Sequence, residues 1–327
     1  MPAWPAPERG IHAPTKGWRV NVAVLSGGVG GARFLRGLIA VVDPGNVSIV
    51  GNVADDIELL GLRVSPDLDS ILYTLTGRSD EARGWGRADE SWRALETVTE
   101  LGGQDWFRLG DRDLGLHLVR TELLRHGAPL SEATTRIAQA LGLDARLMPA
   151  TDDPLRTFLE TPAGTFPFQR WFVARGHRDE VDAVHYAGAP DATPAPGVLE
   201  ALREADVILI APSNPYVSIG PILAVDEIRG ALEHRSVPSV AVSPLIGGHA
   251  VKGPADRMLH RLAGGTTPAH VASCYAGLID ALVIDVADAP AELPAGIRPV
   301  VTRTLMSDLD AARQLAAAAL DAAGAPA

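Results

Sequence analysis

The stretch VAVLSGGVGGARFLRGL at residues 22–38 decides the fold of this chain. An apolar run typical of a buried strand is followed by four glycines where that strand should end: Gly27, Gly28, Gly30 and Gly31. Apolar residues then recur at helical spacing, which predicts a helix over about 31–42. A strand, a glycine turn and a helix N-terminus together form a cradle for phosphate, because free amides and the helix dipole attract an anion. A tight turn without a ligand is the alternative.

Further apolar runs predict the rest of the sheet, and they lie at residues 47–50, 207–212, 240–243 and 281–286. Their hydrophobicity is continuous rather than alternating, which favours parallel strands covered on both faces. Helical patterns alternate with them, at about 221–233 and in the alanine-rich C-terminal segment, where Ser307 is the expected N-cap. We therefore expect an α/β fold with a doubly wound, mostly parallel, Rossmann-like sheet.

Composition along the chain predicts its division into parts. The proline-rich residues 1–18 are expected to form a disordered tail, and 19–327 a single α/β domain. Within it, about 85–150 contains helical patterns and no obvious strand, which indicates a helical subdomain inserted over the ligand edge of the sheet. Short strands are expected between 155 and 187, including the segment FQRWFVA.

Charge and cysteine content exclude several classes of function. A net charge of −11 argues against nucleic acid as a partner, because its phosphates would be repelled. The single cysteine rules out a disulfide framework and favours a reducing, cytoplasmic location. No apolar stretch approaches the roughly 18–20 residues of a membrane span, so no membrane partner is expected.

The spelling of the glycine loop argues against two common phosphate-binding motifs. A Walker loop needs a lysine, and this loop has none. The dinucleotide fingerprint would begin at Gly28, but its last glycine is replaced by Arg33, which counts against a nicotinamide-dependent dehydrogenase. Arg33 instead offers a charged clamp for a phosphate.

Acidic residues gather after the second expected strand. Asn52, Asp55 and Asp56 follow it directly, and Asp67 and Asp69 lie in the first turn of a helix that starts at Ser65-Pro66. Acidic residues in a first turn can simply favour the helix dipole. Four carboxylates this close together repel one another, however, unless a hard cation such as Mg²⁺ lies between them and a phosphate.

Three more loops carry polar or flexible residues. Two follow later strands and offer candidate nucleotide-binding residues: Ser213, Asn214, Gly247, Gly248 and Lys252. The third, FRLGDRDLGLHL at 107–118, contains Arg108 and is either a surface ion-pair cluster or a polar binding loop.

Taken together and in this order, these motifs resemble the 2-phospho-L-lactate transferase family, whose actinobacterial members act as phosphoenolpyruvate transferases in coenzyme F420 biosynthesis. The resemblance runs from about residue 20 to the end of the chain and rests on these segments: SGGVGGARFLRGL, NVADDIELLGLRVSPDLDSILYTLTG, RGWGRADESW, LGDRDLGLHLVRT, PATDDPLRT, APSNPYVSIGPILAV and SPLIGGHAVKGPAD.

The resemblance implies the transfer of a phosphoenolpyruvyl or 2-phospho-L-lactyl group. The donor is a guanosine diphosphate adduct of enolpyruvate or lactate. The acceptor is the ribityl hydroxyl of the deazaflavin FO, 7,8-didemethyl-8-hydroxy-5-deazariboflavin. The products are dehydro-F420-0 or F420-0 together with GMP. The actinobacterial resemblance favours the enolpyruvyl donor, although no residue distinguishes it from lactyl or glyceryl.

The resemblance also implies Mg²⁺ as cofactor and a homodimer. Asp55, Asp56 and Asp69 are the expected metal ligands, with Asp56 and Asp69 catalytic and Asp69 orienting or deprotonating the attacking hydroxyl. Asp69 and Arg108 would contact FO, while the glycine loop, Asn52 and the two later loops would surround the nucleotide. The main alternative is a non-catalytic regulatory relative of the same fold that binds a nucleotide-sugar.

Overall fold

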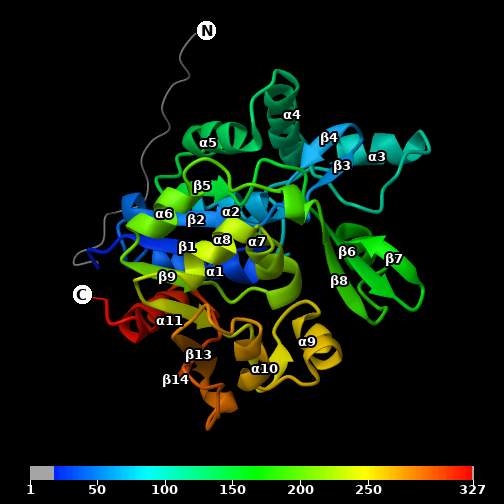
Figure 1. Ribbon diagram of the computed structural model, residues 1–327. Coiled ribbons are helices and arrows are strands. Elements are labelled where there is room, and N and C mark those ends of the chain that lie inside the picture. The colour runs from blue at the N-terminus through cyan, green and yellow to red at the C-terminus, as the bar shows by residue number, and fades with distance from the viewer. Residues whose placement is uncertain (1–17, 326–327) are drawn as a thin grey trace.

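The computed structural model describes residues 18–325 (Figure 1). The expected tail therefore lies outside the described residues, except for Trp18, which forms a bridge with Val42. Within the described residues, seven strands form one sheet in which every neighbouring pair is parallel. Their order is β5 (Arg146–Pro149), β2 (Val47–Gly51), β1 (Val22–Ser26), β9 (Val207–Ile210), β10 (Ser239–Val242), β13 (Ala281–Asp285) and β14 (Arg298–Thr302). This confirms the expected fold class.

The strand order reverses once, between β1 and β9. From β1 the chain builds outward through β2 to β5, then returns to β9 and builds the other way to β14. Two loops therefore leave the carboxyl ends of β1 and β9 and diverge, which opens the crevice where such sheets bind ligands. The loops touch at this point, since Ser213 Oγ donates a hydrogen bond of 2.7 Å to the carbonyl of Gly27.

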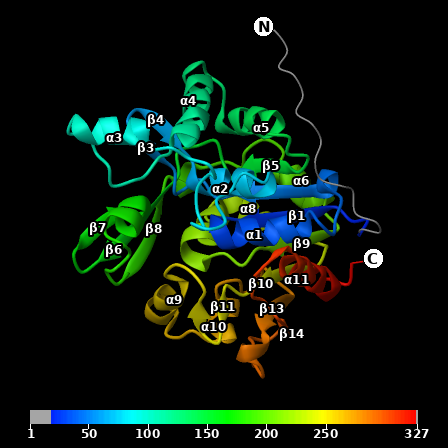
Figure 2. The same ribbon diagram turned by 180° about the vertical axis from the view of Figure 1, so that it is seen from behind.

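Helices cover both faces of the sheet (Figures 1 and 2). On one face, Val22 and Val24 join the core formed by α1 (Gly28–Leu38), α2 (Pro66–Leu75), α5 (Leu130–Ala140) and α11 (Leu309–Ala322). On the other, Ala23 and Leu25 join the core formed by α6 (Val198–Glu204), α7 (Gly220–Leu223), α8 (Asp226–Glu233), α9 (Ala255–Ala263) and α10 (Pro268–Ser273). Burial on both faces explains why the central strands are mainly apolar, whereas the edge strand β14 is largely exposed.

Two small hairpins and two helices extend beyond the carboxyl edge of the sheet (Figure 1). They are β3 (Ile57–Leu59) with β4 (Leu62–Val64), β11 (Leu245–Ile246) with β12 (His249–Ala250), α3 (Arg93–Glu100) and α4 (Asp111–Arg125). The expectation of no strand between 85 and 150 was wrong, because β5 pairs with β2 at the edge of the sheet. β5 has only four residues, which are too few to show the hydrophobic pattern of a strand.

Residues 155–187 contain an antiparallel sheet of β6 (Arg156–Thr161), β7 (Gly164–Pro167) and β8 (Ala183–Ala187). The segment FQRWFVA was expected as a strand, and this was wrong, since Arg170–Ala174 forms a π-helical turn. Phe168, Trp171 and Phe172 pack together in a separate small core. Their spacing of three and four residues is helical rather than alternating.

Two helix boundaries also differ from the expectation. The region 221–233 is divided into α7 and α8, and the N-cap of α11 is Asp308 rather than Ser307. Asp308 Oδ1 accepts from the amide of Ala311 at 2.8 Å, and Ser307 instead donates to Asp308. A carboxylate accepts hydrogen bonds more strongly than a hydroxyl. Within residues 18–325, no helix has both the length and the apolar character to cross a bilayer.

Candidate active site

The glycine loop between β1 and α1 requires glycine at two positions. Gly28 has a φ of +69°, a left-handed conformation that favours glycine. A Cβ on Gly27 would lie 2.5 Å from Oδ2 of Asp67, so there is no room for a side chain. The loop thus leaves backbone amides at the N-terminus of α1, where the helix dipole attracts an anion.

Asn52, at the end of β2, joins three loops at the switch point. Its Nδ2 donates to Oδ2 of Asp67 at 2.9 Å and to the carbonyl of Val217 at 3.2 Å, and its Oδ1 accepts from the amide of Ala54 at 2.9 Å. The side chain is fully buried. The structure therefore places Asn52 beside the glycine loop, where it also fixes Asp67.

Three buried carboxylates lie next to this junction. Burial raises the pKa of Asp55 well above its usual value, and the charge of Asp67 adds to the effect. Burial likewise raises the pKa of Asp67 to about 6, against the hydrogen bonds from Asn52 and Gly28. Burial also raises the pKa of Asp56, which the charge of Arg63 opposes. A cation placed here would stabilise the ionised forms of all three.

The residues present fit a hard divalent cation in part. Oδ1 of Asp55 and Oδ1 of Asp56 are buried and have no hydrogen-bond partner, and the same is true of Ser26 Oγ at the end of β1. Carboxylate oxygens are the ligands that Mg²⁺ prefers. Among residues 18–325, no three His, Cys, Asp or Glu side chains are already gathered as a metal-binding group. The donor chemistry therefore fits, with Asp55 and Asp56 each offering one unpartnered oxygen.

Asp69 faces a different partner, the guanidinium of Arg120. Arg120 is fully buried and binds Asp69 in a bidentate ion pair, with NH1 at 3.1 Å from Oδ2 and NH2 in contact with Oδ1. His117 extends the network, since its Nδ1 lies 3.8 Å from Asp69 and its Nε2 lies 3.3 Å from Asp113. In this arrangement both oxygens of Asp69 are held by Arg120.

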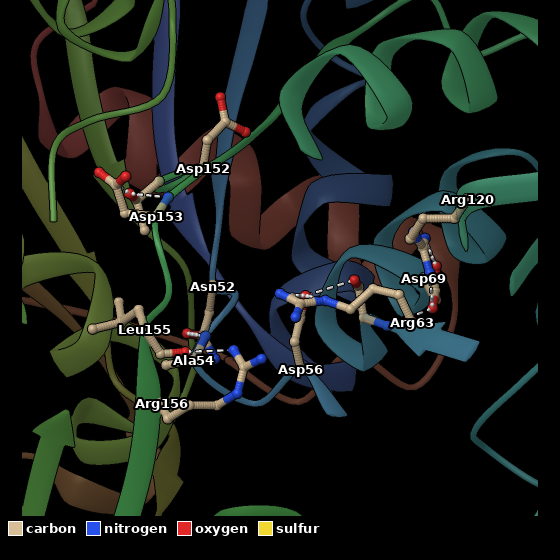
Figure 3. Close-up of polar contacts among 12 residues, drawn as sticks. Asn52, Ala54, Asp56, Arg63, Asp69, Arg120, Asp152, Asp153, Leu155 and Arg156 are labelled. Carbon is tan, nitrogen blue, oxygen red and sulfur yellow. Dashed lines mark hydrogen bonds and ion pairs between the residues drawn. The ribbon is translucent and has the colours of Figure 1, made fainter. Parts of the chain in front are cut away.

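Asp56 is held from two sides (Figure 3). Its Oδ2 accepts from Ser65 Oγ at 2.7 Å and pairs with Arg63, whose Nε and NH2 lie 3.1 and 3.0 Å away. Ser65 stands at the predicted N-cap of α2 with Pro66 after it, but its hydroxyl binds Asp56 rather than capping the helix. Arg156, from the start of β6, points toward this pair.

Arg33 lines a cavity of about 260 Å³ beside the glycine loop. The cavity lies between α1, α2, residues 79–86 and the start of α11, and its lining includes Val29, Arg33, Ser70, Tyr73, Trp85 and Leu309. Ser70 directly follows Asp69, and Val29 directly follows Gly28. The cavity therefore adjoins both the glycine loop and the helix that carries Asp69.

Arg108 belongs to a layered set of arginines and tryptophans near that cavity. The guanidinium of Arg108 lies 4.5 Å from the ring centre of Trp92, and that of Arg83 lies 5.3 Å from Trp92 and 4.7 Å from Trp85. Trp85 is 43% exposed although it is large and apolar. Such cation–π pairs hold the rings in place, and the exposed part of Trp85 is accessible to a ligand.

The remaining candidate nucleotide-binding residues are divided between the site and its surroundings. Ser213 contacts the glycine loop, whereas Asn214 caps the following π-helical turn through the amide of Tyr216. The amides of Gly247 and Gly248 donate to the carboxylate of Asp288, at 3.0 and 2.9 Å.

The ammonium group of Lys252 lies against Gly84, which lines the Arg33 cavity.

A second cavity, of about 540 Å³, lies behind the π-helical turn Pro215–Ile219. Tyr186, Tyr216 and Cys274 line it, together with α7, α8 and α10. It contains none of the predicted site residues, so the chemistry is better placed at the switch point.

Sequence reasoning missed several residues that the structure brings to the site. From the sequence, Asp67 is one of four nearby acids and is not an expected metal ligand. Nothing in the sequence singles out Arg120 within the helical pattern LGLHLVRT. Arg63 and Arg156 were not noticed either. Arg156 belongs to PATDDPLRT, one of the segments that carry the family resemblance, and this membership marks it as a candidate site residue.

The fold and the site together define a Rossmann-like α/β protein with a glycine loop and buried carboxylates at its topological switch point. The model of the family described as 2-phospho-L-lactate transferase CofD matches residues 22–322. The chain therefore belongs to this family of transferases.

Individual relatives agree with the family match. The phosphoenolpyruvate transferase of Streptomyces coelicolor is 44% identical over 92% of this chain and 97% of its own length. The phosphoenolpyruvate transferase of Mycolicibacterium smegmatis is 39% identical over 93% and 99%. A solved structure of a UPF0052 family member from Bacillus halodurans has a TM-score of 0.61 at 18% identity, covering 92% of this chain and 99% of that one, and shows the shared fold.

Proposed function

We propose that this chain transfers a phosphoenolpyruvyl or 2-phospho-L-lactyl group from a guanosine-diphosphate-linked donor to the ribityl hydroxyl of FO, in coenzyme F420 biosynthesis. The family match and the relatives named phosphoenolpyruvate transferase support the class of reaction. The main structural support for the proposal is the environment of the acidic residues. Buried carboxylate oxygens without partners lie beside a glycine loop at the switch point of the sheet.

The diphosphate of the donor is proposed to lie at the N-terminus of α1. The amides of the first turn beyond Gly28, whose own amide donates to Asp67, and the helix dipole favour its negative charge. Ser213 binds the glycine loop to the loop after β9, and Asn52 binds the loop after β2 to Val217 in that same loop. The phosphate that carries the three-carbon acid would then lie nearest to the carboxylates.

Mg²⁺ is proposed as the cofactor, held by Asp55 with Asp67, and with Asp56 in reach through its free oxygen. When bound, it neutralises charge on the two phosphates of the donor. Asp55 and Asp67 are both buried, so their ionisation depends on a nearby positive charge. The acidic chain would in this way hold an anionic donor.

Asp69 is proposed to orient the attacking hydroxyl. Arg120 fixes its carboxylate at the start of α2, one residue from the Arg33 cavity. The hydroxyl oxygen forms a bond to the phosphorus that carries the three-carbon acid. The bond between that phosphorus and the bridging oxygen breaks, GMP leaves with the bridging oxygen, and the hydroxyl proton passes to Asp69 or to water. Alignment and charge neutralisation supply most of the catalysis in such transfers.

The flat deazaflavin is proposed to bind in the Arg33 cavity, against Trp85 and near Arg108. Aromatic stacking suits a planar ligand, and Ser70 and Thr74 offer hydroxyl groups along the same wall. Val29 and Ser70 place the inner end of this cavity beside the phosphate site, which is where the ribityl chain must reach.

A direct assay tests the proposal. The protein is incubated with FO, Mg²⁺ and guanosine-diphosphate-linked enolpyruvate or lactate, and the products are followed by mass spectrometry. We expect a new deazaflavin that carries the phosphorylated acid, in amounts equal to the GMP released. Binding of nucleotide-sugars without any transfer would instead support a non-catalytic regulator.

A further inference from the structure

Arg156 is a half-buried cation without an acidic partner among the described residues. Its guanidinium donates to the carbonyl of Leu155 at 2.8 Å, and no ion pair is formed with it. The nearby acids are engaged elsewhere. Asp152 accepts from the amide and hydroxyl of Ser131, and Asp153 accepts from Thr193. Figure 3 shows both of these carboxylates directed away from Arg156.

A second guanidinium lies beside it. Arg63 pairs with Oδ2 of Asp56, and its side chain is 27% exposed. Burial lowers the pKa of Arg156, and the charge of Arg63 lowers it further, while the charge of Asp56 opposes this without forming an ion pair. Two cations thus lie near a single carboxylate, with which only Arg63 forms an ion pair, in a chain whose net charge is −11. Like charges are held together in this way mainly where an anion completes the arrangement.

The two arginines lie next to the proposed phosphate site. The amide of Thr157 donates to the carbonyl of Ala54 at 2.9 Å, which fixes Arg156 beside the loop that carries Asp55 and Asp56. Asp55 in turn interacts with Asp67, which lies against Gly27. Arg156 is thereby attached to the loop whose acids adjoin the glycine loop.

We propose that Arg63 and Arg156 form the subsite that binds the carboxylate of the transferred three-carbon acid. The proposal rests on the proposed function and deepens it. Guanidinium groups bind carboxylates through paired, charge-assisted hydrogen bonds. Enolpyruvyl, lactyl and glyceryl groups all carry this carboxylate, so the subsite recognises their class without distinguishing among them.

Paired ligands test the subsite. Isothermal titration with Mg²⁺ compares guanosine-diphosphate-linked lactate with the β-ethyl ester of guanosine diphosphate, which is the same adduct without its carboxylate. We expect the protein to bind the lactate adduct about 10- to 100-fold more tightly, the range for a hydrogen-bonded charge. Arg156→Gln should remove most of that preference and leave the affinity for the ethyl ester unchanged. Arg156→Lys should restore part of it, and the surface control Arg136→Gln should change neither affinity.

Two results would overturn the subsite. They are equal weakening of both ligands by Arg156→Gln, or an unchanged preference in that variant while its unfolding transition remains normal. Failure of the proposed function is distinguishable from these. In that case the unaltered protein binds neither adduct and forms no deazaflavin product, and the subsite falls with it.

Discussion

Arg120 and Asp69, 51 residues apart in the chain, form a bidentate ion pair that is closed to solvent. Arg120 comes from α4 and Asp69 from the first turn of α2, so the pair joins the segment beyond the sheet edge to the helix beside the glycine loop. A buried ion pair of this kind fixes geometry more than it adds stability. It holds the carboxylate proposed to meet the acceptor.

Removal of the Arg120 side chain should lower the stability of the folded protein. Arg120→Met leaves Asp69 buried without its counter-charge, and we expect a loss of about 3–5 kcal/mol in the free energy of unfolding. Urea denaturation measures it. Arg136→Met, which breaks the exposed pair with Glu132, is the control and should cost less than about 1 kcal/mol. Equal losses in the two variants would contradict the role of the buried pair.

Asp69→Asn keeps the shape of the side chain and removes its charge. We expect transfer to FO to fall by at least about 100-fold, because the attacking hydroxyl loses the carboxylate that orients it. Binding of GDP should change little, since its phosphates are proposed to lie at the glycine loop. Near-normal turnover in the mass-spectrometric assay would remove Asp69 from the reaction.

Asp67 should make the ligand-free protein less stable as the pH rises. Its folded pKa is raised from 3.8 to about 6 by burial, so protonation favours the folded state. The stabilising contribution is complete below about pH 3.8 and is lost as the pH rises through 6. Asp67→Asn should therefore gain stability over the unaltered protein between pH 4 and 7, by up to about 3 kcal/mol. Urea midpoints in EDTA at several pH values check this, and a pH-independent difference would contradict it.

Two glycine-to-alanine changes should affect different properties, one the binding of GDP and the other the stability of the fold. Gly27→Ala places a Cβ 2.5 Å from Asp67, and we expect weaker binding of GDP with Mg²⁺ by at least about 10-fold, as the loop and the carboxylate are pushed apart. Gly230, inside α8, has no atom within 4 Å of an added Cβ. Gly230→Ala should raise the free energy of unfolding by about 0.5–1 kcal/mol and leave GDP binding unchanged. Calorimetric titration and thermal unfolding distinguish the two.

Trp85 should matter for the acceptor and not for the donor. We expect Trp85→Ala to raise the KM for FO by about 3- to 10-fold, the range for a lost aromatic contact. The affinity for GDP should stay the same, because Trp85 is proposed to contact the deazaflavin and not the diphosphate. Quenching of tryptophan fluorescence by FO, present in the unaltered protein and reduced in the variant, is an independent readout. A change in GDP affinity alone would contradict the assignment.

The sequence by itself determined the main architecture of this protein. Continuous apolar runs specify the parallel strands β1, β2, β9, β10 and β13, because strands buried on both faces are mainly apolar, with polar residues such as Ser239 and Asp285 at their ends. The glycine loop and the polar residues after β2 and β9 mark the carboxyl edge, since those glycines and carboxylates suit no buried strand. The family resemblance followed from the same segments, and the family match agrees with it.

Only the tertiary structure decided which of these residues act together. Asp67 lies against Gly27, Asp69 against Arg120, and Asp56 against Arg63. These pairings depend on how α2, α4 and the loops pack, and spacing along the chain does not encode them. Short strands such as β5, and buried cations such as Arg120, leave no periodic signal. Charge and hydrogen bonding in a buried site are set by three-dimensional neighbours, and for that reason the fold could be predicted while the roles of the individual aspartates could not.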